Sequence, residues 1–281
     1  MKTRRNDRLS ARQLGALALT AAGLPCFHLC CRVSWPWVLL GSLGAALTLS
    51  LLTGLAERRR RAGPQTGGAF LLLPILLFGA LYAAWKSSFA FPETAGNLLT
   101  AAYVLGLSAA AAHTGPAAAG RCAGVLLWIT GALYGTVLLF SLPQLRLEWL
   151  RPVGSALDAV KVWAALLPPG AALLLAGRLG EDQRLPHWPW WTAAGIAAAA
   201  SAVTGGILSP ALAREPEAFR TLARGVSVLG VIRRFEALVN GALLMSGFCL
   251  CALLLSAAAA LWRPGESVKR RKTSLQKFFE K

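Results

Sequence analysis

Charged residues are scarce in this 281-residue sequence, at 15%, and acidic residues are the scarcest of them, with 12 Asp and Glu against 29 Lys and Arg. Hydrophobic residues account for 56%, and the mean hydropathy is +0.54. A chain with so little charge and so much apolar surface is neither a water-soluble domain nor a disordered one. The composition therefore predicts an all-α polytopic membrane protein, with residues 1–281 forming a single integral membrane domain.

The sequence also lacks the short motifs of common enzyme classes. It contains no Gly-x-Ser-x-Gly elbow, no His-Glu-x-x-His pair and no phosphate-binding loop, so we expect no enzyme and no cofactor. One cluster, Cys26-Phe-His28-Leu-Cys30-Cys31, has the ligand types of a metal site. In a helix, however, His28 lies on the face opposite Cys26 and Cys30, and no second cluster completes a tetrahedral site. We therefore expect neither a metal site nor a structural disulfide.

Basic residues mark the topology. They occur in short tracts between apolar runs, which is typical of membrane proteins, and we expect no nucleic-acid partner. A basic cytoplasmic tail at 1–13 and another at 263–281 flank the membrane spans within 14–262. With both termini cytoplasmic, 19 of the 29 Lys and Arg lie inside, namely those of the two tails, Arg58–Arg61, Arg121, Arg178 and Arg184. Eight spans are predicted, at about 14–31, 37–55, 70–85, 98–112, 125–142, 156–176, 190–208 and 237–261.

Outside the spans, two segments have amphipathic character. The sequence from Leu145 to Arg151 alternates charged and bulky apolar residues and predicts a short interfacial helix. The longer segment from Ser209 to Arg234 also predicts amphipathic helix on the outer side.

Two of the predicted spans are interrupted near their middle. The first contains Gly23-Leu24-Pro25, and the sixth contains Pro168-Pro169-Gly170. Proline removes an amide donor and costs roughly 3 kcal/mol in a helix interior, and backbone opened at membrane depth occurs where it is buried or lines a polar cavity. We therefore predict half-helices whose free N–H and C=O groups bind a ligand, although a packed proline kink is the alternative. The predicted ligand-binding residues are Gly23, Pro25, Pro169, Gly170, Ala171 and Ala172.

Six segments, taken in order, carry a family resemblance. They are Leu9-Ser-Ala-Arg-Gln-Leu14, Phe91-Pro92-Glu93-Thr94, Arg121, the run from Leu145 to Pro152, Leu166-Leu-Pro-Pro-Gly170 and Arg234-Phe-Glu236-Ala-Leu238. In this order and spacing the chain resembles the spore germination permease family, the membrane B subunit of endospore nutrient germinant receptors, within the amino acid/polyamine/organocation transporter superfamily. The resemblance implies a shortened inverted-repeat permease with broken helices 1 and 6, in the cell membrane or spore inner membrane. It also implies structural motif residues at Pro92, Glu93, Thr94, Arg121, Arg234 and Glu236.

Two features depart from that family. Its members have ten spans rather than eight, and they usually carry a glutamate soon after the glycine of the sixth span, where this chain has Ala171 and Ala172. No other carboxylate lies deep in a predicted span, so proton-coupled transport is not expected. The resemblance implies a receptor subunit that recognises a small nutrient such as an amino acid and assembles with a large membrane subunit and a lipoprotein. An amino-acid permease, or a divergent member without transport, remains an open alternative.

Overall fold

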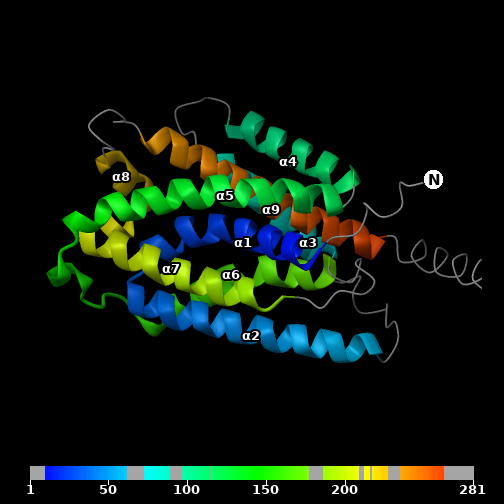
Figure 1. Cartoon of the computed structure of the whole chain (residues 1–281), viewed down its shortest axis with the longest axis horizontal. Coiled ribbons are helices and arrows are strands. Elements are labelled where there is room, and N and C mark those ends of the chain that lie inside the picture. The colour runs from blue at the N-terminus through cyan, green and yellow to red at the C-terminus, as the bar shows by residue number, and fades with distance from the viewer. Residues whose placement is uncertain are drawn as a thin grey trace, which may run out of the picture.

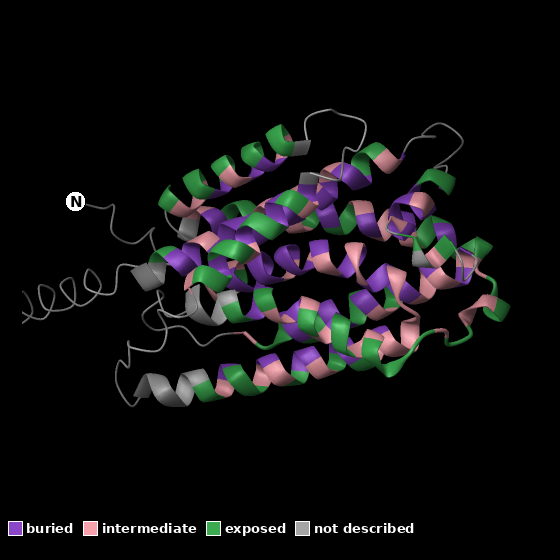
Figure 2. Cartoon of the chain, turned by 180° about the vertical axis from the view of Figure 1, so that it is seen from behind, coloured by how far each residue is buried: buried purple, intermediate pink, exposed green. Residues whose placement is uncertain are grey.

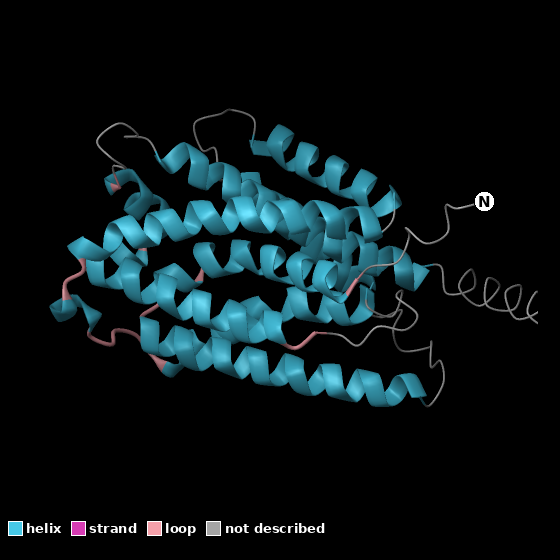
Figure 3. Cartoon of the chain, viewed as in Figure 1, coloured by secondary structure: helices cyan, strands magenta, loops and turns pink. Residues whose placement is uncertain are grey.

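The computed structural model describes residues 10–61, 73–88, 97–114, 116–176, 186–208, 212–215, 217–226 and 235–262. Within these ranges every regular element is a helix, and no strand occurs (Figure 3). Among the described residues, four short 3-10 segments connect the α-helices, namely η2 (Cys30–Arg32), η4 (Leu142–Gln144), η5 (Leu147–Leu150) and η7 (Leu212–Arg214). The α-helices are α1 (Ala11–His28), α2 (Trp35–Arg61), α3 (Leu73–Ser88), α4 (Asn97–Thr114), α5 (Pro116–Ser141), α6 (Ala156–Ala176), α7 (Trp188–Ile207), α8 (Ala218–Gly225) and α9 (Phe235–Trp262).

The long helices form an elongated bundle around α1 and α9 (Figure 1). Helix α1 contacts α5, α7 and α9, and 72% of its apolar window is buried, as is the same share of α9. Helices α2 and α4 lie along opposite edges of the bundle, and their outward faces are exposed (Figure 2). Large apolar side chains are exposed on the peripheral helices, among them Phe78, Leu98 and Trp128. A lipid-facing surface has this character, because hydrocarbon rather than water covers it.

The two ends of the bundle differ. At one end, here called the tail end, α1 begins and α2 and α9 end (Figure 1). Ser10 starts α1 there with a capping box: its hydroxyl accepts from the Gln13 N–H at 3.2 Å, and the Gln13 side chain accepts from the Ser10 N–H at 2.9 Å. At the opposite end, here called the loop end, α1, α5 and α7 finish and the connection from α5 to α6 runs across the bundle.

All eight apolar segments predicted as spans coincide with α-helices. Four helices in the described part of the chain are long and apolar enough to cross a membrane, over Ala11–Arg32, Trp35–Leu55, Ala118–Gln144 and Phe235–Ala259. Two shorter apolar helices cover Leu73–Ser87 and Leu98–Thr114. The prediction of a helical membrane protein is therefore supported by the structure, while the count of eight crossings stays a prediction.

The predicted breaks in the first and sixth helices are wrong. Helix α1 continues through Gly23 and Pro25, and α6 continues through Pro168 and Pro169. Pro25 lies in the last turn of α1, where its carbonyl still accepts from the Leu29 N–H at 3.0 Å. A proline this close to the end of a helix disturbs one backbone bond, and little helix follows it.

Packing against α2 explains why α6 stays helical. Pro169 and Gly170 are buried, and a Cβ on Gly170 would collide with the side chain of Leu49. One turn from the start of α6, a Cβ on Gly41 of α2 would collide with the carbonyl oxygen of Ala159. The two helices therefore approach closely on both sides of the proline pair (Figure 1). This close contact holds the backbone in a helical path despite the two missing amide donors.

The predicted interfacial helix from Leu145 to Arg151 is also wrong in form. The structure has only a four-residue 3-10 segment there, Leu147–Leu150. The backbone of this segment forms hydrogen bonds with distant parts of the chain instead. The Arg146 N–H donates to the Gly206 carbonyl at 2.8 Å, and the Leu150 carbonyl accepts from the Trp35 indole at 2.9 Å. The amphipathic segment from Ser209 to Arg234 does contain a helix, the eight-residue α8.

Candidate functional site

The described residues of the predicted ligand set line neither of the two described cavities. Gly23 faces α9 and α5, because a Cβ there would lie 2.7 Å from the Ser246 hydroxyl and 3.7 Å from the Tyr134 ring. Gly170 faces α2 through Leu49. Both glycines therefore act as contact points between helices.

The other members of the predicted ligand set differ in exposure. Pro25 is half-buried, Pro169 is buried and Ala171 is exposed. Ala172 lies in α6, and its side chain is outside the described part of the chain. No described cavity includes both the α1 and the α6 members of the set.

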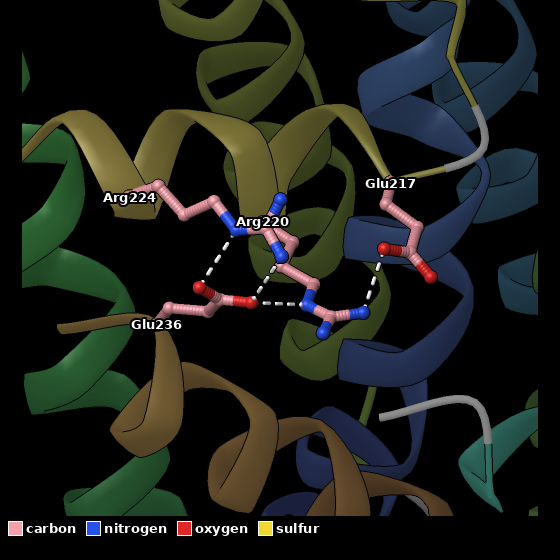
Figure 4. A network of polar contacts seen from close by, with 4 residues as sticks. All are labelled: Glu217, Arg220, Arg224 and Glu236. Atoms are coloured by element: carbon pink, nitrogen blue, oxygen red, sulfur yellow. Dashed lines mark hydrogen bonds and ion pairs between the residues drawn. The ribbon is translucent and has the colours of Figure 1, made fainter. Parts of the chain in front are cut away.

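Of the structural motif residues, Glu236 has the clearest role. Its carboxylate accepts hydrogen bonds from two arginines of α8 (Figure 4): Oε1 accepts from Arg220 Nε at 2.7 Å, and Oε2 accepts from Arg224 Nε at 2.7 Å. A second Arg224 nitrogen, Nη2, donates to Oε1 at 2.8 Å, and Arg220 Nη1 donates to Glu217 Oε2 at 2.6 Å. These four residues, here called the Glu236 clamp, fasten α8 to the start of α9.

The Arg220 side chain is the buried member of the Glu236 clamp, at 7% exposure, against 23% for Glu236 and 54% for Arg224. A buried guanidinium requires a charged partner, because desolvation of an unpaired charge is costly. Sequence reasoning missed Arg220. The available signal was the spacing of Glu217, Arg220 and Arg224 at i, i+3 and i+7, which places all three on one face over about two turns of helix.

An aromatic cluster anchors the other side of α8. Phe219 is fully buried between α1 and α5, with ring centroids 4.5 Å from Phe27 and 5.7 Å from Tyr134. The Phe27 and Tyr134 rings lie 3.9 Å apart, and the Tyr134 hydroxyl is 3.3 Å from the Ser246 hydroxyl. Helix α8 is therefore inserted into the loop end by Phe219 and held there by the Glu236 clamp.

A small polar cavity lies beside the Glu236 clamp, between the ends of α1 and α3 and the sides of α8 and α9. Its volume is about 20 Å³, and His28, Lys86, Arg220 and Asn240 line it. Asn240 is 5% exposed, and its Oδ1 has no hydrogen-bond partner among the described residues. A space of this size can hold one water molecule, which such an oxygen requires.

A much larger opening, here called the loop-end cleft, lies on the other side of the α1 terminus. Its volume is about 570 Å³, within the range of small-molecule sites. Its walls come from η2 and the residues between η2 and α2, from the connection before α6, and from the first two turns of α6, with one residue each from α7 and η7. Arg32, Arg151, Lys161 and Asp158 are the charged residues that line it.

Two long-range hydrogen bonds join the walls of the loop-end cleft. The Trp35 indole N–H donates to the Leu150 carbonyl at 2.9 Å, and the Val153 N–H donates to the Ser34 hydroxyl at 2.9 Å. The segment with the Trp-Leu-Arg-Pro sequence thus crosses the start of α2 in a fixed register. The sequence alone did not show that Arg32 and Arg151 would border one cleft.

The other predicted structural motif residues lie outside the Glu236 clamp. Arg121 is an exposed residue of α5. Pro92, Glu93, Thr94 and Arg234 fall outside the described residues. Compared with known proteins, the chain matches no protein-family model and no curated protein.

Proposed function

We propose that this protein is a non-enzymatic integral membrane subunit of a spore nutrient germinant receptor and recognises a small nutrient at its loop end. The proposal is carried by the position, in the structure, of two segments that contribute to the family resemblance. The segment 145–152 borders the loop-end cleft, and Glu236 forms the clamp beside the polar cavity. Two segments far apart in sequence, each part of the family resemblance, therefore both lie beside a described cavity at the loop end.

The proposal places the protein in the spore inner membrane with both termini cytoplasmic, so that the loop end faces outward. The four-arginine block ends α2 at the tail end, where α1 begins and α9 ends. In the sequence, the basic tails precede α1 and follow α9. Basic residues favour the cytoplasmic side. A large membrane subunit and a lipoprotein are the expected partners.

The test is deletion of the gene in the organism that encodes it. We expect spores of the deletion strain to lose the response to at least one nutrient of an amino-acid and sugar panel, measured as dipicolinate release and loss of optical density. The wild-type gene should restore the response. Normal germination of deletion spores on every nutrient would contradict the receptor proposal.

An amino-acid permease of the same superfamily would give a different result. The purified protein in proteoliposomes would then accumulate a labelled amino acid, whereas a receptor subunit or a member without transport would not. The unbroken α6 supports the receptor, because a central transport site of this kind would need half-helices with free backbone groups.

A further inference from the structure

The loop-end cleft has a surplus of positive charge. Lys161 Nζ is paired with Asp158 Oδ1 at 2.8 Å, so these two lining residues neutralise each other. Arg32 and Arg151 form no ion pair with any described residue. A cleft with two arginines left over attracts an anion, and the low dielectric of its walls strengthens that attraction.

The two arginines lie on two segments of the wall that are joined by hydrogen bonds. Arg32 is two residues before Ser34, and Arg151 lies between Leu150 and Val153, whose backbone groups bond to Trp35 and Ser34. The hydrogen bonds that fix these two segments use backbone groups and the side chains of Ser34 and Trp35. Both guanidinium groups therefore remain available to the cleft while their backbones are fixed.

The start of α6 forms another part of the wall. Gly154 has a φ of +119°, and a Cβ there would lie only 2.6 Å from Asp158 Oδ2. Glycine thus lets the chain turn tightly into α6, where the Ser155 N–H donates to Asp158 Oδ2 at 3.2 Å. The charges of Asp158 and Lys161 cancel in this part of the wall, so an anion is favoured beside Arg32 and Arg151 instead. Trp149 also lines the cleft and can contact an apolar group of the ligand.

We propose that the loop-end cleft binds a small carboxylate-bearing molecule, whose carboxylate is held between Arg32 and Arg151. Guanidinium groups bind carboxylates through paired hydrogen bonds, which gives both charge and geometric selectivity. This inference extends the proposed nutrient recognition by giving its ligand class and its place, at the loop end and not between α1 and α6.

The experiment measures binding to the full chain, purified in phosphatidylcholine nanodiscs, by tryptophan fluorescence and by calorimetry. Three small probes distinguish recognition of a carboxylate from recognition of an ammonium group. L-lactate and L-alanine carry a carboxylate, and isopropylamine carries only an ammonium group. Saturable binding of lactate or alanine at millimolar or lower concentration is expected, without binding of isopropylamine. Trp149→Phe should reduce the fluorescence change if the ligand lies beside this ring.

The arginine variants identify the site. Arg32→Gln and Arg151→Gln should each weaken carboxylate binding roughly 10- to 100-fold, the effect of losing one charged hydrogen-bonding partner. Arg146→Gln is the matched control, because Arg146 lies on the same segment, packs 4.7 Å from the Trp149 ring and does not line the cleft. If a glutamine variant does not fold, Arg32→Lys and Arg151→Lys keep the charge, remove the paired geometry and should still weaken binding.

Several results would overturn the inference. These are absence of saturable binding by both carboxylates, equal binding of isopropylamine, or unchanged affinity in both cleft variants. Binding of phosphatidylglycerol in place of lactate, with the same arginine dependence, would instead assign the cleft to an anionic lipid.

The germination test with deletion spores and the binding experiment in nanodiscs test two separate claims. Deletion spores that germinate normally, together with arginine-dependent lactate binding, would reject the receptor role and keep the site. Loss of germination in the deletion spores, without carboxylate binding by the purified protein, would support the receptor role and reject the carboxylate site.

Discussion

Replacing Glu236 with glutamine removes the charge that holds both arginines of α8 while nearly preserving the side-chain shape. The buried Arg220 would keep only Glu217, whose side chain is 36% exposed. Removing one partner of a buried ion pair typically costs about 3 to 5 kcal/mol, and the remaining Glu217 contact reduces that cost. We therefore expect Glu236→Gln to destabilise the docking of α8 by about 2 to 3 kcal/mol, close to the value of one or two charged hydrogen bonds.

Hydrogen exchange can measure this loss locally. If α8 exchanges by opening from the bundle, a cost of about 2 to 3 kcal/mol lowers its amide protection roughly 30- to 150-fold. Arg224→Gln is the matched control, because Arg224 is 54% exposed and contacts the same carboxylate. Exposed pairs contribute about 0 to 1 kcal/mol, so protection should fall about fivefold or less in the control. Equal protection losses in the two variants, or none in Glu236→Gln, would refute the view that the clamp holds α8 through a buried charge.

Three further predictions concern topology, packing and assembly. In a cysteine-free background, Leu147→Cys at the loop end should react with an impermeant maleimide in intact cells and Thr114→Cys should not; the reverse pattern would invert the orientation. Gly170→Leu should lower thermal stability by about 1 to 3 kcal/mol through overpacking against Leu49, whereas Ala171→Leu on the exposed face should be tolerated, as melting in nanodiscs would show. If both variants instead keep wild-type stability and lose the nutrient response, this result would support the predicted ligand site at the proline pair. The protein should co-purify with other membrane subunits, because exposed helix surface is available to them, and a stable monodisperse preparation of the single chain would argue against obligatory assembly.

Helix positions were predictable because each apolar run is a local signal. The eight runs found by hydropathy all became helices, and the Ser10 and Gln13 spacing accounts for the start of α1. These features depend on residues within a few positions of one another. A bundle of helices can therefore be inferred from sequence before any tertiary contact is known.

The errors arose where contacts distant in sequence decide the local structure. The proline pair of α6 remains helical because Leu49, more than a hundred residues earlier, packs against Gly170. Likewise the run from Leu145 to Arg151 has helical amphipathicity, yet its backbone bonds to Trp35 and Gly206. Local propensity gives no information on such partners, so tertiary packing overrode it in both segments.

The charged residues of the candidate sites were only partly predictable. The family resemblance selected Glu236, whose carboxylate binds two arginines of α8. Arg220 and Arg32 were not selected, because an arginine in a connecting segment is usually solvated. Their significance depends on burial beside Glu236 and on sharing a cleft with Arg151, which only the folded chain shows.

The two hydrogen bonds between the start of α2 and the segment before α6 would also oppose any separation of the two cleft walls that they join. Each such bond contributes about 0.5 to 1.5 kcal/mol, so breaking both would cost about 1 to 3 kcal/mol. A form with the two walls separated would then make up between roughly one-sixth and less than one per cent of the molecules. A bulky ligand that fits only this minor form binds roughly 6- to 160-fold more weakly than its own contacts would allow. Ser34 and Trp35 would therefore act as a size filter, although neither residue needs to touch the ligand.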